Sequence, residues 1–137
     1  RQTAPNPRRI VNGVDSSRVA MVLAVLESRM GLTLSDRDVY VSTVGGVRLV
    51  EPAADLAIAI AVANAVKNRK VSKRLAAIGE LTLTGEIRNV TQAAQRASEA
   101  KRLGYHTVLD SSSRKLAQAL NELQVRGMPR DDSEPGF

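Results

Sequence analysis

The clearest pattern in the chain is a set of apolar residues at helical spacing near its amino end. The positions that share this spacing are Val19, Val22, Leu23, Leu26 and Met30. Intervals of three and four residues place these side chains on one face of a helix, which a polar residue at 15–17 can cap and which Gly31 ends. Before this helix, residues 9–11 predict a short strand that closes at the Asn12-Gly13 turn signal.

Segments rich in β-branched residues and an alanine-rich segment follow the first helix. Residues 39–44 and 47–50 predict two strands, or one strand bent at Gly45-Gly46. Pro52 suits the first turn of a second helix, which we expect to run to about Val66. That helix is apolar nearly all round, so we expect it to pack on more than one side.

The second half of the chain predicts further strands and helices. The expected strands lie at 76–83, 86–90 and 106–109, and the expected helices at 91–103 and from 111 or 112 to 126. Thr91 is the expected cap of the first of these helices, and Ser111 or Ser112 of the second. Because the strand pairs at 39–50 and 76–90 resemble hairpins, we predict an α+β fold with a mixed β-sheet and packed helices rather than a doubly wound parallel sheet.

Length and composition place these elements in one domain. A chain of 137 residues, 43% of them hydrophobic, can bury one core. We expect residues 1–9 to be a linker remnant, residues 10–126 to form the domain and residues 127–137 to be a disordered acidic tail. The chain has no cysteine and a single histidine, His106, which excludes thiolate chemistry and multi-histidine metal sites. No apolar run approaches the roughly 20 residues that span a bilayer, so we expect a cytoplasmic protein without a membrane partner.

The charge balance indicates an anionic partner. Lys and Arg number 20 against 14 Asp and Glu, and without its last ten residues the chain carries +8. A basic body favours nucleic acid as the partner. Aromatic residues make up 2% of the chain, so the expected contacts are with phosphates rather than with stacked bases. The sequence contains no Gly-Lys dipeptide, which excludes a P-loop for ATP from these residues.

Two stretches of the sequence carry a family resemblance. Residues 44–57 read VGGVRLVEPAADLA, and residues 79–88 read GELTLTGEIR. Together they resemble the carboxy-terminal domain of the bacterial RadA/Sms recombination and DNA-repair proteins, which is itself similar to the proteolytic domain of Lon proteases. The resemblance runs from about Gly13 to Leu109. It implies the Lon-protease-like fold, also described as ribosomal protein S5 domain 2-like.

The same resemblance implies that peptidase chemistry is lost. Lon-type proteases use a serine in a Pro-Ser-Ala-Gly motif and a lysine on a later helix, and these positions correspond here to Ala53 and Arg96. Alanine has no hydroxyl to act as a nucleophile, and an arginine stays protonated and cannot act as a base. Asp55 also replaces the glycine of the motif. We therefore expect a non-proteolytic domain with no catalytic residue, and an active Ser-Lys peptidase is the low-probability alternative.

The implied parent protein is an ATP-dependent DNA-repair motor. RadA/Sms proteins combine a zinc motif, a RecA-like ATPase domain and the Lon-like domain in a hexameric ring that drives branch migration of recombination intermediates. ATP, Mg and Zn are therefore implied for other domains of the parent, and no cofactor for these residues. The implied partners are DNA, further copies of the chain and a RecA-type recombinase.

The candidate DNA-binding residues are basic. They are Lys67, Arg69, Lys70, Lys73 and Arg74 in one dense cluster, together with Arg48, Arg88 and Arg96. A solvated loop is the alternative interpretation of the cluster, and a structural salt bridge, for example with Asp55, is the alternative for Arg96. A purely structural oligomerisation domain without DNA contact is the alternative for the whole chain.

Overall fold

The first helix follows its sequence pattern closely. The computed structural model describes residues 8–42, 51–69, 75–105 and 107–125. Helix α1 spans Ser16–Met30, and the carboxylate of Asp15 caps it by accepting a hydrogen bond from the backbone N–H of Ser17 at 3.0 Å. Gly31, with φ of 69°, ends the helix in the left-handed conformation that glycine adopts without steric cost. Both predicted ends of this helix are confirmed.

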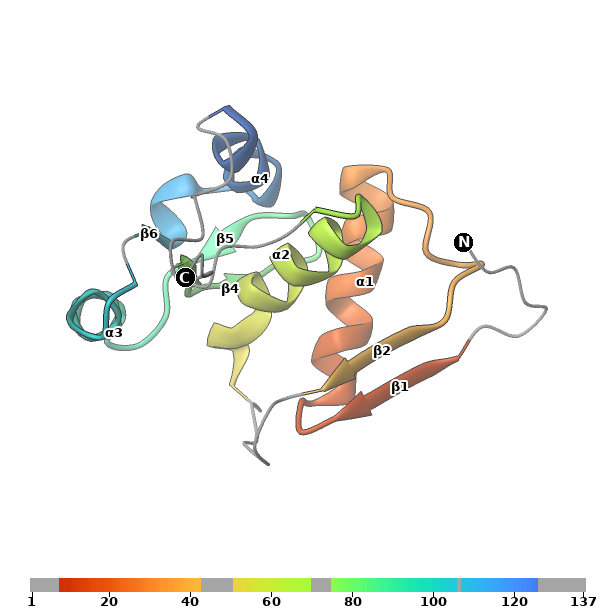
Figure 1. The fold of residues 1–137 in the computed structure, drawn as a ribbon, viewed down its shortest axis with the longest axis horizontal. Helices are drawn as coiled ribbons and strands as arrows, with labels where there is room; N and C mark the ends of the chain where they lie inside the picture. Colours follow the sequence, from red (N-terminus) through yellow and green to blue (C-terminus); the bar gives the residue numbers. More distant parts are fainter. Residues whose placement is uncertain (1–7, 43–50, 70–74, 106, 126–137) are drawn as a thin grey trace, which may run out of the picture.

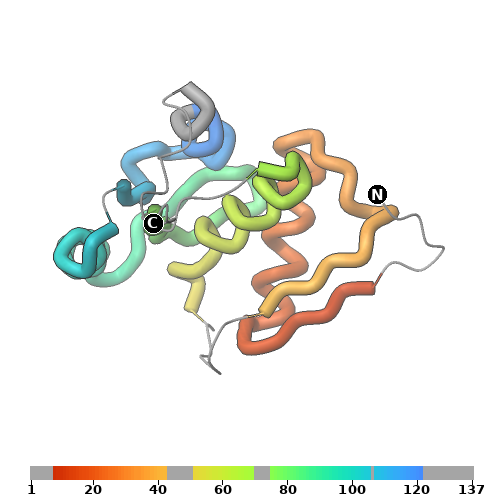
Figure 2. The backbone as a smooth tube through the Cα atoms, in the orientation of Figure 1, coloured from red at the N-terminus to blue at the C-terminus, as the bar shows by residue number. Residues whose placement is uncertain are grey.

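A parallel strand pair lies beside α1. Strand β1 (Arg9–Asn12) pairs with β2 (Val39–Ser42), and the chain passes from one to the other through α1, as the tube in Figure 2 shows. The guanidinium of Arg9 donates to the carbonyl of Leu34, in the loop between α1 and β2, at 2.8 Å. The strand expected at 47–50 lies outside the described residues.

The second helix supplies most of the remaining core. A short 3₁₀ turn, η1 (Pro52–Ala54), leads into α2 (Asp55–Val66), which lies alongside α1 in Figure 1. The core between them includes fully buried Val22, Val25, Leu26, Leu56 and Ala59. Helix α2 buries residues on most of its circumference but leaves a row of alanines at positions 57, 61 and 65 exposed. The expectation that this helix packs on more than one side is therefore confirmed.

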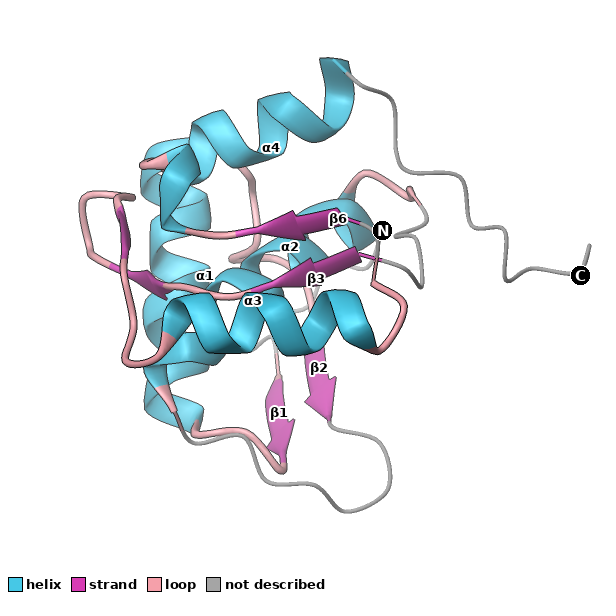
Figure 3. Ribbon diagram, turned by 90° about the vertical axis from the view of Figure 1, so that its left-hand side faces the viewer, coloured by secondary structure: helices cyan, strands magenta, loops and turns pink. Residues whose placement is uncertain are grey.

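The second half of the chain adds another parallel pair and a hairpin. Strands β3 (Leu75–Ala77) and β6 (Thr107–Leu109) are parallel, with α3 (Ala93–Arg102) in the connection between them (Figure 3). Strands β4 (Glu80–Leu81) and β5 (Ile87–Arg88) form the predicted antiparallel hairpin. The 3₁₀ turn η2 (Ser111–Ser113) and helix α4 (Leu116–Val125) end the described chain.

Three local expectations are wrong. The strand expected at 76–83 is interrupted at Gly79. The N–H of Gly79 donates to the carbonyl of Ala53, just before helix α2, at 3.0 Å and is therefore not available to a neighbouring strand. The residue at the start of helix α3 is Gln92 and not the predicted Thr91. Gln92 has a left-handed backbone conformation and makes no capping hydrogen bond with its side chain. The helix expected from 111 or 112 begins only at Leu116, because residues 111–113 form the separate turn η2, and the carboxylate of Asp110 caps that turn by accepting from the N–H of Ser112 at 2.9 Å.

The predicted α+β class is confirmed, with both parallel and antiparallel pairs. The parallel pairs arise because α1 and α3 act as crossover connections, which the hairpin-like strand spacing did not indicate. Within the described ranges, no helix is long and apolar enough to cross a membrane.

Candidate functional site

The two positions that the family resemblance assigns to the lost peptidase site, Ala53 and Arg96, line one cavity. Ala53 in η1 and Arg96 in α3 both line a cavity of about 720 Å³ between η1, α2, β3 and α3. Its walls are mostly small apolar residues, among them Ala57 and Ala77. Among the described lining residues there is no Ser, Thr, Cys, Lys or His. Ala53 and Arg96 therefore share one cavity, although they come from distant parts of the chain.

Arg96 forms an ion pair at the edge of this cavity. Its Nη2 lies 2.9 Å from Oε2 of Glu51, and the two side chains are 36% and 63% exposed. An ion pair this exposed to water contributes about 0–1 kcal/mol to stability. Arg96 therefore forms a salt bridge, which is the alternative to a DNA contact, and its partner is Glu51 rather than Asp55.

Asp55 has a different partner, which the sequence analysis missed. This carboxylate is fully buried and accepts hydrogen bonds from Nε of Arg18 at 3.1 Å and from Nη2 of the same guanidinium. The backbone N–H of Leu81 donates to it as well, at 3.0 Å. The hydrogen bond to Asp55 raises the pKa of Arg18 above its ordinary value. Asp55, in place of the motif glycine, thus fastens α1 and β4 to the start of α2.

The remaining predicted cations are exposed or lie outside the described residues. Lys67 and Arg69 follow the end of α2, and Arg88 lies on β5; all three side chains are exposed. None of them is among the described residues that line the cavity of Arg96. The predicted positions outside the described residues are Arg48, Lys70, Lys73 and Arg74.

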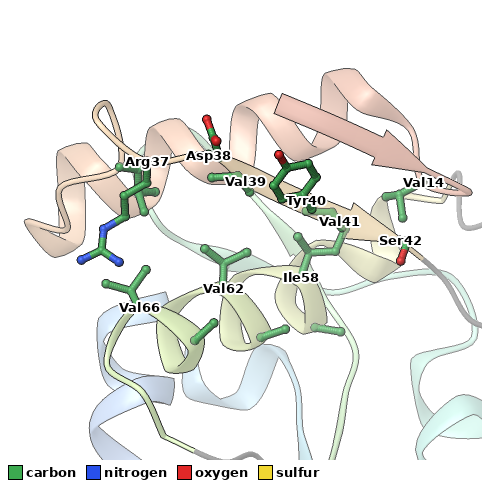
Figure 4. A pocket seen from close by; sticks show the side chains of 14 residues that line it. Val14, Arg37, Asp38, Val39, Tyr40, Val41, Ser42, Ile58, Val62 and Val66 are labelled. Carbon is green, nitrogen blue, oxygen red and sulfur yellow. The ribbon is translucent and has the colours of Figure 1, made fainter. Parts of the chain in front are cut away.

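A second cavity, of about 700 Å³, lies between β2 and α2. Figure 4 shows Val39 and Val41 of β2 facing Ile58 and Val62 of α2 across it. The polar side chain of Arg37 lies at one end. The cavity is lined mainly by apolar residues, and its described lining contains no histidine, cysteine or lysine.

Comparisons with known proteins match the chain to one family model and to several DNA repair proteins. A family model described as subunit ChlI of Mg-chelatase matches residues 15–114. The DNA repair protein RadA of Halalkalibacterium halodurans is 46% identical over 104 residues, which are 76% of this chain and 23% of that protein. The DNA repair protein RadA of Mycolicibacterium smegmatis is 48% identical over 103 residues, or 75% of this chain and 22% of that protein.

The chain belongs to the ChlI family and, within it, to the Lon-like domains of RadA-type DNA repair proteins. The same domain of the Bacillus subtilis DNA repair protein RadA is 44% identical over 104 residues. The chain spans less than a quarter of the length of these curated relatives. The family resemblance drawn from residues 44–57 and 79–88 is thereby confirmed.

Proposed function

We propose that this chain is the non-proteolytic Lon-like module of a RadA-type DNA repair protein, and that it contributes sequence-independent contacts to DNA phosphates and to ring assembly. The observation that carries the proposal is a set of exposed cations that have no carboxylate partner in the described part of the chain. Lys67, Arg69 and Arg88 belong to this set. Such cations attract the phosphate backbone without reading the base sequence.

The absence of peptidase activity is part of the proposal. Ala53 offers no hydroxyl at the cavity, and Arg96 keeps its proton and pairs with Glu51. A serine-lysine dyad needs both an attacking hydroxyl and an amine that becomes neutral near pH 7. Ala53 lacks the hydroxyl and Arg96 lacks the neutral amine, so restoring only one of the two residues would not restore the reaction.

The whole protein supplies the rest of the proposed activity. We place the ATPase, with its ATP, Mg and Zn, in domains outside this chain, which spans about 23% of the length of its relatives. The assembled protein would form a hexameric ring in the cytoplasm and drive branch migration of recombination intermediates. A RecA-type recombinase is a further proposed partner.

DNA binding by charge variants tests the proposal. Fluorescence anisotropy against random-sequence duplex and single strands is measured across a salt series, with the 137-residue chain and with the full-length protein. One variant replaces Lys67, Arg69, Lys70, Lys73 and Arg74 by alanine, and a second replaces Arg88 and Arg96. The control for the second removes Lys101 and Arg102, two exposed cations at the end of α3 that complement its helix dipole.

We expect salt-dependent binding that weakens in both test variants and persists in the control. The slope of log affinity against log salt should fall by about 0.9 for each lost phosphate contact on duplex DNA. If the wild-type chain shows no salt-dependent binding, and neither variant weakens DNA binding by the full-length protein, the proposed DNA contact is wrong.

A purely structural role in ring assembly is the second candidate. The observation that favours it is the exposed row of Ala57, Ala61 and Ala65 along α2, since small residues allow another surface to approach a helix closely. Sedimentation of the 137-residue chain at increasing concentration measures this association. Replacing Ala61 by glutamate should shift the chain toward the monomer, whereas a strictly monomeric wild-type chain would count against assembly through this domain.

A further inference from the structure

A strained turn joins η2 to α4. Arg114 has φ of 65° and ψ of −47°, a conformation in which a side chain is unfavourable. The N–H of Lys115 donates to the carbonyl of Ser113 at 2.7 Å, which closes a three-residue γ-turn around Arg114. Glycine adopts a positive φ without steric cost, so an arginine at this position keeps the turn under strain.

The surrounding structure holds this turn in place from both sides. The carbonyl of Arg114 accepts from the N–H of Ile87 in β5 at 2.6 Å, and the N–H of Leu116 donates to the carbonyl of Gly85 at 2.7 Å. Ser113 before the turn is 2% exposed, and Leu116 after it is fully buried. The backbone of the turn is therefore fixed against the β4–β5 hairpin, while the side chains of Arg114 and Lys115 are exposed.

Two more exposed cations belong to the same corner of the molecule. Arg88 follows Ile87 directly on β5, and the aliphatic stem of Arg29, at the end of α1, lies against the hairpin turn. A Cβ atom built on Gly85 would be 3.5 Å from Cγ of Arg29. In the described part of the chain, neither these two cations nor Arg114 and Lys115 form an ion pair.

Two of the four cations lie opposite an acidic residue, but none of the described ion pairs joins them. Glu86 lies opposite Lys115 in a β-bridge, and Glu80 lies opposite Arg88 in the hairpin. Glu80 is also directed to another cation, since its Oε2 is 3.9 Å from Nη2 of Arg18. Asp110 is engaged by the N–H of Ser112. Among the described strand pairs and bridges, none sets a carboxylate opposite Arg29 or Arg114.

We propose that Arg29, Arg88, Arg114 and Lys115, the hairpin corner, form a phosphate-binding surface for the backbone of DNA. This inference rests on the proposed function and adds Arg29, Arg114 and Lys115 to its contacts. A guanidinium offers a planar fork of N–H donors that matches two phosphate oxygens at once. The strained γ-turn holds one such fork and the neighbouring ammonium outward on a fixed backbone, so little freedom is lost when phosphate binds.

Opposite effects on stability and on binding test the role of the turn. Replacing Arg114 by glycine relieves the strain and removes the guanidinium, so we expect a higher Tm together with weaker DNA binding. Loss of one phosphate contact corresponds to about an eightfold weaker affinity at 0.1 M salt and a salt slope lower by about 0.9 on duplex DNA. Arg114→Lys should keep most of the affinity, and Lys115→Ala should weaken binding without a change in backbone conformation.

The control variant is Arg102→Ala, which removes one exposed cation that is already paired with Glu99 on α3. All variants are measured in the 137-residue chain and in the full-length protein against the same random-sequence duplex. If the wild type binds with the expected salt dependence but Arg114→Gly and Lys115→Ala bind no more weakly than Arg102→Ala, the hairpin corner is not a binding surface and the proposed function stands. If the wild-type chain shows no salt-dependent binding, and none of the variants weakens DNA binding by the full-length protein, the proposed DNA contact is wrong and this inference fails with it. Should Arg114→Gly fold poorly, Lys115→Ala and Arg29→Ala decide the question.

Discussion

Replacing Arg18 by methionine should destabilise the protein far more than an ordinary surface substitution. Methionine retains most of the aliphatic packing of the side chain, but it leaves the carboxylate of Asp55 without its cation. Asp55 is fully buried, whereas the side chain of Arg18 is 25% exposed. Removing one partner of a buried ion pair costs about 3–5 kcal/mol, and the partial exposure of Arg18 places the expected loss near the lower end, about 3 kcal/mol.

The expected loss is large compared with the total stability of a domain, which is about 5–15 kcal/mol. For a domain of this size it corresponds to a fall in Tm of roughly 10 °C. Urea denaturation followed by circular dichroism measures the loss directly, provided that the slope of the unfolding free energy against urea is unchanged.

A second substitution isolates the unpaired charge as the cause. The double variant Arg18→Met/Asp55→Asn removes the charge but keeps an oxygen that accepts from the N–H of Leu81. It should regain at least half of the stability lost in Arg18→Met, because no buried charge remains and the backbone donor is still paired. A loss below about 1 kcal/mol in Arg18→Met would refute this reasoning, since that is the value of a solvent-screened surface pair.

Three further predictions concern other parts of the chain. Because Ala53 and Arg96 line the first cavity, the purified chain should neither cleave unfolded protein nor react with a serine-directed probe. Turnover, or labelling of residues at this cavity, would contradict the assignment of Ala53 and Arg96 as inactive positions. Gly79→Ala should lower the free energy of unfolding in urea by about 1–3 kcal/mol, because the new Cβ would lie 2.6 Å from Cγ2 of buried Ile87. An unchanged urea midpoint would show that Gly79 is not closely packed against Ile87. The hydrogen bonds from Ser17 lower the pKa of Asp15 below its ordinary 3.8, so its contribution to stability is present above that pH and is lost as the pH falls through the lowered pKa. The Tm of Asp15→Ala should therefore lie below that of the wild type at pH 7, and the difference should shrink as the pH falls through the lowered pKa of Asp15; a difference that stays constant would contradict this cap.

Local patterns predicted the elements of this fold better than the contacts between them. The periodicity of α1, with Asp15 and Gly31 at its ends, gave the correct helix because cap and apolar face are encoded within neighbouring residues. The pair of Arg18 and Asp55 joins residues 37 positions apart and leaves no periodic signal.

In the candidate site, too, local sequence indicates some residues but not the contacts that they make. The assignment of Ala53 and Arg96 comes from a family motif and its spacing and stays a prediction, while the structure shows that both residues line one cavity. Glu51 as the partner of Arg96 depends on how α3 packs, which the local sequence does not specify. The γ-turn at Arg114 likewise has no signature, because its positive φ is imposed by hydrogen bonds from β5 and not by a glycine.

The packing of α3 has a consequence for local opening of the protein. None of the ten residues of this helix is fully buried, and no side chain caps its amino end. Detaching it exposes little apolar surface, so its amides should exchange with solvent through openings far smaller than global unfolding. The opposite wall is fixed, because Gly79 bonds to Ala53 and Leu56 on both sides of the helix start. We therefore expect one wall of the cavity to stay fixed while the wall formed by α3 opens locally and carries Arg96 with it.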